Sequence, residues 1–291
     1  NSQQLQEVEL CEGLLEIGER AFESCKSLRH IKIPSTVTVI RPRAFSGCEK
    51  LETIQLNEGL LEIGDWTFSI CKSLNAINIP STVRTIGESA LYKTKLSHIN
   101  LPDGIESIGG RAFRYSKLLN FRMPPLITTI STGLFSGCEP LFSVELSEST
   151  TQIGNVSFSL CHSLRNVVLP INIEIGDNVF RYCTDLLQLF DTQQQIINAL
   201  KSRFDNLPIH KMIYYHSYNN LTSDQLGDAA NMRAGQSRSL RSKLNPTGRE
   251  QDCLGMTPLH ILACSTVQNI SLYQMLIGKY PENLITEDRW G

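Results

Sequence analysis

The chain has 291 residues, enough to bury a substantial core as two domains or as one elongated repeat array. Apolar residues make up 41% and charged residues 19%, and the formal net charge is only −2. This balance argues against wholesale disorder and against electrostatic capture of nucleic acid. No apolar run reaches the length of a transmembrane helix, so we expect no membrane-spanning segment in this sequence.

A marker residue recurs every 22 or 23 positions through the first two-thirds of the chain. An Ile-Gly pair stands just before the marker, Cys follows it by three positions and Leu by six. This regularity predicts a solenoid of about eight coils over residues 5–191. The markers are Phe22, Phe45, Phe68, Leu91, Phe113, Phe135, Phe158 and Phe180.

Each coil is expected to contain one strand and one short helix. In the first coil, Leu28 to Ile33 ends with a two-residue alternation that is typical of a strand, and Pro34 stops it. The spacing of apolar residues over Glu19 to Lys26 predicts a short helix or helical turn on the opposite side. Stacked coils then form a parallel sheet over a continuous apolar core.

The cysteines at the repeat position are expected to be free, reduced and buried. The fourth and fifth coils are one residue shorter and carry Thr94 and Ser116 there, so the position requires only a small residue. The turns of these two coils should be tighter. The repeat-position cysteines are Cys25, Cys48, Cys71, Cys138, Cys161 and Cys183.

Outward positions of the predicted strands form a varied polar surface on the concave side, with Phe142 as an apolar anchor. Repeat solenoids commonly bind partners there. The alternative is a solvated face without a partner. The candidate partner-binding residues are Arg29, Lys32, Gln55, Asn78, Asn100, Arg122, Phe142, Glu145 and Arg165.

The unit Ile-Gly-x-x-Ala-Phe-x-x-Cys-x-x-Leu-x-x-Ile-x-Ile-Pro resembles the BspA-type leucine-rich repeat of bacterial surface proteins and of protist and algal proteins. The resemblance implies an α/β leucine-rich repeat solenoid with a parallel β-sheet. It also implies a binding role without catalysis, and leaves adhesion, scaffolding and immune-type recognition open.

After the array, we expect a connecting or capping helix at 192–204. The motif Asp205-Asn206-Leu207-Pro208-Ile209-His210 then resembles the Asp-x-Thr-Pro-Leu-His opening of an ankyrin repeat, with Leu in place of Thr. The resemblance implies a degenerate ankyrin-like repeat at 205–230. A basic flexible loop at 231–251 should follow, where Ser, Arg and Gly are frequent. It could contact an acidic or phosphate-bearing partner, be phosphorylated, or simply be solvated. Its cations are Arg233, Arg238, Arg241, Lys243 and Arg249.

The segment 252–287 resembles an ankyrin repeat, with Thr257-Pro258-Leu259-His260 opening its first helix. Thr257 suits an N-cap, Pro258 suits the first helical turn, and 271–280 predicts the second helix. Residues 288–291 repeat the motif at 252–255, as the start of a further ankyrin repeat that is cut short. The resemblance implies an all-α, ankyrin-like helical segment in what we take to be a fragment.

The sequence contains no phosphate loop, nucleophile elbow or zinc-protease motif, so we expect no enzyme, no cofactor and no metal. The first hypothesis is a protein–protein interaction scaffold, intracellular and cytoplasmic because ankyrin repeats mostly are. The alternatives are a cell-surface or secreted adhesin, and the regulatory arm of an enzyme whose catalytic domain lies outside the fragment. The partner is expected to be a protein of unknown identity and not a nucleic acid.

Overall fold

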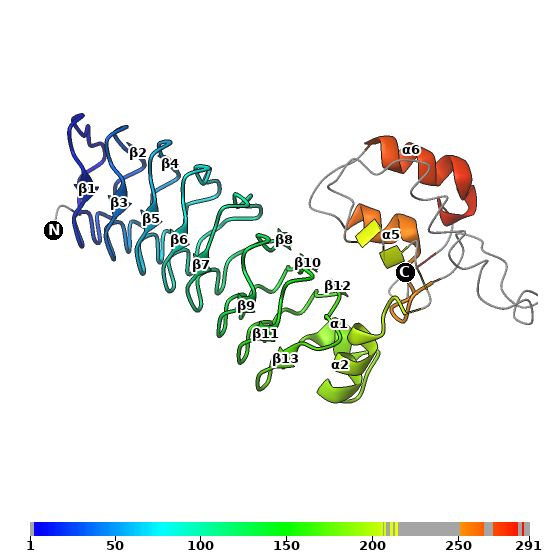
Figure 1. Ribbon diagram of the computed structural model, residues 1–291. Coiled ribbons are helices and arrows are strands. Elements are labelled where there is room, and N and C mark those ends of the chain that lie inside the picture. The colour runs from blue at the N-terminus through cyan, green and yellow to red at the C-terminus, as the bar shows by residue number, and fades with distance from the viewer. Residues whose placement is uncertain are drawn as a thin grey trace, which may run out of the picture.

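A computed structural model describes residues 3–205, 207, 210–211, 213–214, 251–264, 270–284 and 287. The first two-thirds of the chain winds into a parallel β-solenoid (Figure 1). Its coils carry two parallel ladders of very short strands, where the sequence predicted one. We call them the main ladder and the second ladder.

The main ladder contains the predicted strands, three of which are followed by a proline, at Pro34, Pro124 and Pro170. Ile31 and Ile54 stand in register and both are buried, whereas their neighbours point outward. The ladder is interrupted between its second and third strands, across the third and fourth coils. Its strands are β2 (His30–Lys32), β4 (Thr53–Gln55), β8 (Asn120–Arg122), β10 (Ser143–Glu145) and β12 (Asn166–Val167).

The second ladder explains the Ile-Gly pair of the repeat. The isoleucine ends each strand, and at most of the glycines the preceding coil lies too close for a side chain. At Gly64, a Cβ would lie 2.7 Å from the backbone nitrogen of Pro42. The strands are β1 (Glu16–Ile17), β3 (Val39–Ile40), β5 (Glu62–Ile63), β6 (Thr85–Ile86), β7 (Ser107–Ile108), β9 (Thr129–Ile130), β11 (Gln152–Ile153) and β13 (Glu174–Ile175).

The helix expected over Glu19 to Lys26 is absent, and a tight turn takes its place. Arg20 and Ser24 have φ of 57° and 60°, in the left-handed region that a right-handed helix excludes. The backbone N–H groups bond to the next coil instead: Phe22 N donates to Ala44 O at 2.7 Å. The helical prediction was wrong because the apolar spacing of this segment reflects bonding between coils.

Bonds of this kind run through every coil from Phe22 to Val179, at 2.7–3.1 Å. They link the turn segments 18–26, 41–49, 64–72, 87–95, 109–117, 131–139, 154–162 and 176–183. We call the surface of these segments the turn face. The turn face therefore adds a third continuous set of hydrogen bonds between coils.

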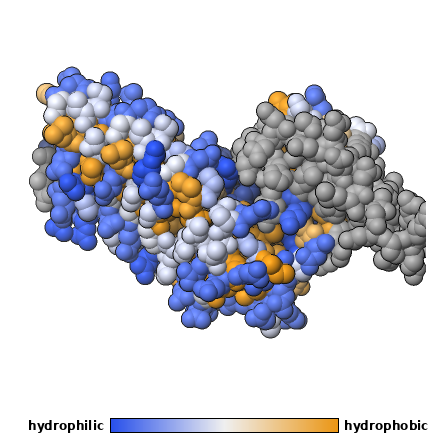
Figure 2. Space-filling model, viewed as in Figure 1, coloured by the Kyte–Doolittle hydropathy of each residue, from blue (hydrophilic) through white to orange (hydrophobic). Residues whose placement is uncertain are grey.

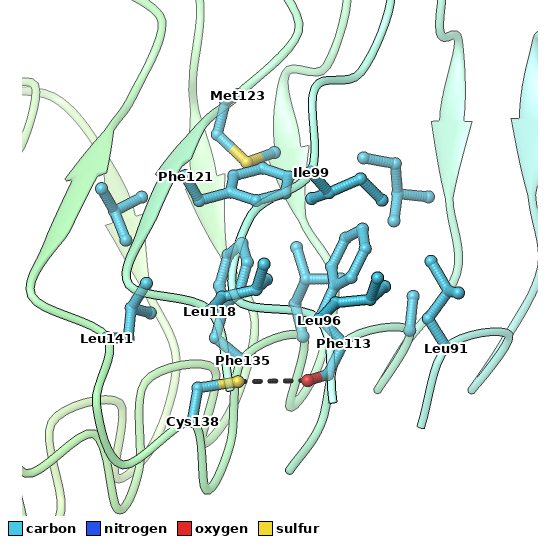
Figure 3. Packing of buried hydrophobic residues seen from close by; sticks show 14 of the residues in the cluster. Leu91, Leu96, Ile99, Phe113, Leu118, Phe121, Met123, Phe135, Cys138 and Leu141 are labelled. Atoms are coloured by element: carbon cyan, nitrogen blue, oxygen red, sulfur yellow. Dashed lines mark hydrogen bonds between the residues drawn. The ribbon is translucent and has the colours of Figure 1, made fainter. Parts of the chain in front are cut away.

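The core is a column of marker side chains. The rings of Phe45 and Phe68 stack at 5.6 Å between centroids, and Phe135 and Phe158 stack at the same distance. Leu91 separates the two runs of stacked rings. Figure 3 shows the centre of the column, where Phe121 packs with its ring centroid 4.8 Å from that of Phe135.

The solenoid is followed by helices. Thr192 caps α2 (Gln193–Lys201), and the capping box with Gln195 fixes where this helix begins. In Figure 1, the short α1 and the longer α2 lie at the end of the coils, after β13. The remaining elements are α1 (Thr184–Leu187), α5 (Pro258–Ala263), α6 (Ile270–Lys279) and the 3-10 helix η1 (Pro281–Leu284).

The view in Figure 2 shows a largely hydrophilic solenoid surface, on which apolar residues form separate small groups. Among the described residues, no helix has both the length and the apolar character that crossing a bilayer requires. Most of the degenerate repeat proposed at 205–230, and residues 288–291, lie outside the described residues.

Candidate functional site

The outward residues of the main ladder form the candidate binding face. Of the nine residues selected from the sequence, Arg29, Lys32, Gln55, Asn78 and Asn100 are exposed. Lys32, Gln55, Asn78 and Asn100 occupy equivalent positions on the first four coils, which brings them onto one surface. The structure thus places the N-terminal half of the predicted face in solvent.

Part of this face is ordered by contacts between coils. Arg29 forms an ion pair with Glu52, and His30 Nδ1 lies 2.8 Å from Thr53 Oγ1 in the next coil. Further along, Arg122 Nη1 donates to Asp103 Oδ1 at 2.9 Å. These exposed or half-exposed pairs contribute little to stability, because water screens them. They do restrict the side chains on the first and fifth coils.

Three amide side chains on the face have no such contacts. Within the described part of the chain, Gln55, Asn78 and Asn100 make no side-chain hydrogen bond. Each amide offers donors and an acceptor, so each can pair with a peptide group. Their alignment across three successive coils forms a row of free hydrogen-bonding groups. We call it the amide row.

The other half of the face is covered by residues beyond the solenoid. Tyr214 inserts its hydroxyl between the ends of β10 and β12, where it donates to Val144 O at 2.6 Å. The same oxygen accepts from Val168 N at 3.2 Å and from Leu146 N at 3.4 Å. The tyrosine therefore satisfies backbone groups that would otherwise be buried without partners.

A buried ion pair secures the same region. Arg203 Nε donates to Asp252 Oδ2 at 2.6 Å, and both side chains are fully buried. Arg203 Nη1 also donates to Asn166 Oδ1 and to Val167 O on β12. Asp252 accepts from the backbone of Leu254 through its other oxygen. The Arg203 guanidinium thus joins β12 to the segment that precedes α5.

Three of the predicted binding residues are less accessible to a partner than the sequence suggested. Glu145 is buried, with 5% of its surface exposed, so it does not face solvent as predicted. Phe142 is half-buried against the core, and the Arg165 guanidinium lies 5.6 Å from its ring centroid. Arg165 Nε also donates to Asp185 at 2.7 Å. The sequence could not reveal that these side chains are covered, because the residues that cover them lie outside the repeat pattern.

The repeat-position cysteines behave as structural side chains. All nine cysteines are free thiols, and the six at the repeat position are buried. Cys138 Sγ donates to Phe113 O of the preceding coil at 3.1 Å (Figure 3). Burial raises the pKa of the Cys48 and Cys183 thiols to about 12 and that of Cys138 to about 11. Such thiols are poor nucleophiles at neutral pH.

The described residues contain no group of three His, Cys, Asp or Glu side chains that could hold a metal ion. His260 has a local role: its Nδ1 accepts from the backbone N–H of Thr257 at 3.0 Å. The basic-loop residues Arg233, Arg238, Arg241, Lys243 and Arg249 lie outside the described residues.

The stacked coils, their parallel ladders and the leucine-rich core define a leucine-rich repeat solenoid with an exposed strand face. The family described as BspA type leucine rich repeat region matches in six copies, over residues 1–120 and 106–231. The chain belongs to this family. Nothing among the curated proteins matches the chain.

A solved structure shows the same architecture. A leucine-rich repeat protein from Bacteroides ovatus ATCC 8483 is 34% identical, with a TM-score of 0.57 over 58% of this chain and 45% of its own. The leucine-rich repeat protein of T. pallidum is 29% identical, with a TM-score of 0.48 over 66% of this chain and 79% of its own. This chain therefore spans less than half of the Bacteroides protein.

Proposed function

We propose that the chain is a non-enzymatic protein-recognition scaffold that binds a protein partner through the exposed half of the main-ladder face. Leucine-rich repeat proteins generally serve as protein-binding scaffolds. What supports the proposal in this chain is the amide row of Gln55, Asn78 and Asn100. Lys32 and Arg29 flank it on the first coil.

The amide row fits a partner that presents an extended backbone. Asn and Gln side chains pair with both the N–H and the C=O of a peptide group. The coils fix the backbone positions of the three amides, so binding has to order only their side chains. The binding region ends near Arg122, because the C-terminal segment occupies the face from β10 onward.

Site-specific photo-crosslinking tests this proposal. A photoreactive amino acid at Asn78 or Asn100 should yield a defined adduct in extracts of the source cells. The same group at Lys50, an exposed position outside the main ladder, should not. The variant Gln55→Lys/Asn78→Lys/Asn100→Lys should lose the adduct when the photoreactive group is at Lys32. Equal labelling at Asn78 and Lys50 would contradict the proposal.

We also propose that α5 and α6 form an ankyrin-like pair that offers a second protein-binding surface. Support comes from the Thr257 cap, from Pro258 at the first helical position and from the His260 contact. Leu272 and Leu276 of α6 are buried. Triple substitution of exposed residues on this pair, tested against the partner found by crosslinking, separates its contribution from that of the amide row.

The cellular setting follows from the same proposals. We propose an intracellular scaffold, since the buried thiols are reduced and the C-terminal motif resembles ankyrin repeats. A signal sequence or distal membrane anchor in the full-length gene would instead favour a cell-surface or secreted adhesin. A catalytic domain in that gene would make this region a regulatory arm.

A further inference from the structure

The turn face carries a cluster of aromatic and cationic side chains on the third, fourth and fifth coils. The ring centroids of Trp66 and Tyr92 lie 6.1 Å apart, and those of Tyr92 and Tyr115 lie 5.9 Å apart. Lys93 Nζ lies 5.3 Å from the Tyr92 centroid and 5.6 Å from that of Tyr115. The Arg114 guanidinium carbon lies 4.9 Å from the Tyr115 centroid. We call these five residues the aromatic–cation cluster.

Four of the five cluster residues lie on the two shortened coils, and Trp66 lies on the full-length third coil. Other coils keep Cys three residues after the marker, whereas these two have Thr94 and Ser116. The neighbouring coil makes room for the outermost ring: a Cβ at Gly137 would lie 2.3 Å from Cδ1 of Tyr115. The repeat pattern therefore departs from its consensus on the two coils that carry four of the five cluster residues.

The local charge is strongly positive. The turn segments 87–95 and 109–117 contain five Lys or Arg residues and one acidic residue, Glu88, in a chain whose net charge is −2. Arg111 pairs with Glu88 at 2.9 Å, and Lys117 lies 3.6 Å from Glu139. Among the described residues, Lys93 and Arg114 form no ion pair. Two cations held over aromatic rings are thus left without counter-charges.

We propose that the aromatic–cation cluster is a second docking surface, for an acidic linear segment of a partner protein. Trp, Tyr and Arg are the residues that contribute most often to binding hot spots. Lys93 and Arg114 would receive carboxylates, and the half-exposed Trp66 and Tyr92 rings would cover an apolar side chain beside them. The surface lies on the turn face, so its occupancy is independent of the amide row.

The intrinsic fluorescence of Trp66 provides the direct test. The chain has two tryptophans, so a Trp290→Phe background leaves Trp66 as the reporter. The probe is a short peptide of glutamates around one leucine. We expect saturable quenching or shifting of the emission that weakens as salt is raised. The same peptide with glutamine in place of glutamate should not bind.

Two variants decide whether the cluster is responsible. Lys93→Glu should lower the affinity for the acidic peptide about tenfold, a change of roughly 1.4 kcal/mol in binding free energy. Arg181→Glu is the matched control, because Arg181 occupies the same turn position as Arg114 and stacks on Tyr182 at 4.7 Å, away from the cluster. It should change the affinity less than twofold. Lys93 is exposed, so its substitution leaves the fold intact, whereas Arg114 Nε is buried.

Three results would overturn the proposal. One is an unchanged affinity for the acidic peptide in Lys93→Glu. Another is an equal loss in Arg181→Glu, which would show only diffuse attraction to basic side chains. The third is more than tenfold tighter binding of a phosphopeptide or a sulfated oligosaccharide to the same cluster, which would assign it to a different anion.

Discussion

The marker phenylalanines illustrate how a single side chain stabilises neighbouring coils. Phe68 is completely buried and stacks on Phe45 of the preceding coil. Its ring is therefore in contact with two coils at once. Removing it leaves a cavity that the rigid backbone ladders on either side cannot easily collapse.

We expect Phe68→Ala to lower the free energy of unfolding by about 3 to 5 kcal/mol, the usual cost of an emptied aromatic site. Phe142→Ala should lower it by less than half as much, because Phe142 is half-buried. Urea denaturation monitored by circular dichroism compares the two variants. Equal losses would mean that the assignment of inward and outward positions is wrong.

The repeat-position cysteines should resist alkylation in the native protein, whereas the exposed Cys11 should react at once.

The raised pKa values of the repeat-position cysteines also predict that the stability of the protein depends on pH. The pKa of the Cys48 thiol is near 9 in the unfolded chain and about 12 in the folded protein. Its burial therefore adds stability at pH values below 9, and this contribution is lost as the pH rises toward 12. Denaturation midpoints should therefore fall between pH 9 and 11, and less steeply in Cys48→Ser. Rapid native alkylation or disulfides among these cysteines would contradict this reading.

At the scale of elements, the connection between the solenoid and the helical segment depends on few contacts. Tyr214 and Arg203 bond to the backbone of β10 and β12, and Asp252 neutralises Arg203. A buried charge without its partner is far more costly than the pair is favourable. The Arg203–Asp252 pair thus specifies where the segment docks.

Arg203→Met should destabilise the docked segment by about 3 to 5 kcal/mol, because it leaves the Asp252 carboxylate buried and unpaired. Asp252→Asn in the same chain should recover a large part of this loss. The amide removes the charge and keeps an oxygen that accepts from Leu254 and Met256. Limited proteolysis after residue 203 and thermal denaturation give the two readouts. Simple additivity of the two losses would show that the residues are not coupled.

At the scale of the whole molecule, the two parts differ in how they are supported. Each inner coil is bonded to a neighbour on both sides, through the ladders and the turn face. In a repeat array, stability is largely a sum of such interfaces. Helix α6 packs chiefly on α5 and η1.

Hydrogen exchange should therefore be slow from Leu51 to Leu169 and much faster over Ile270 to Lys279. The expected boundary lies near α2, where the coils end. Mass spectrometry of peptic peptides resolves the two regions. Equal protection in both would show that the helical segment and the solenoid unfold as one cooperative unit.

The sequence by itself determined the register of the coils, the marker column, the buried cysteines and the start of α5. These features repeat or are local, so the spacing of Phe, Cys and Leu, or a Thr-Pro cap, is sufficient to predict them. It also located the amide row, because outward positions alternate with buried isoleucines. The ankyrin identity and the role of the basic loop stay predictions.

Only the tertiary structure decided which side chains of the candidate face are available. Glu145 is buried in the region where Tyr214 and Arg203, many residues later in the chain, bond to β10 and β12. The second ladder and the left-handed turns likewise depend on hydrogen bonds between coils, which satisfy backbone groups that a helix would have paired internally. Apolar spacing reports which side chains are buried, but it does not specify the partner of each backbone group.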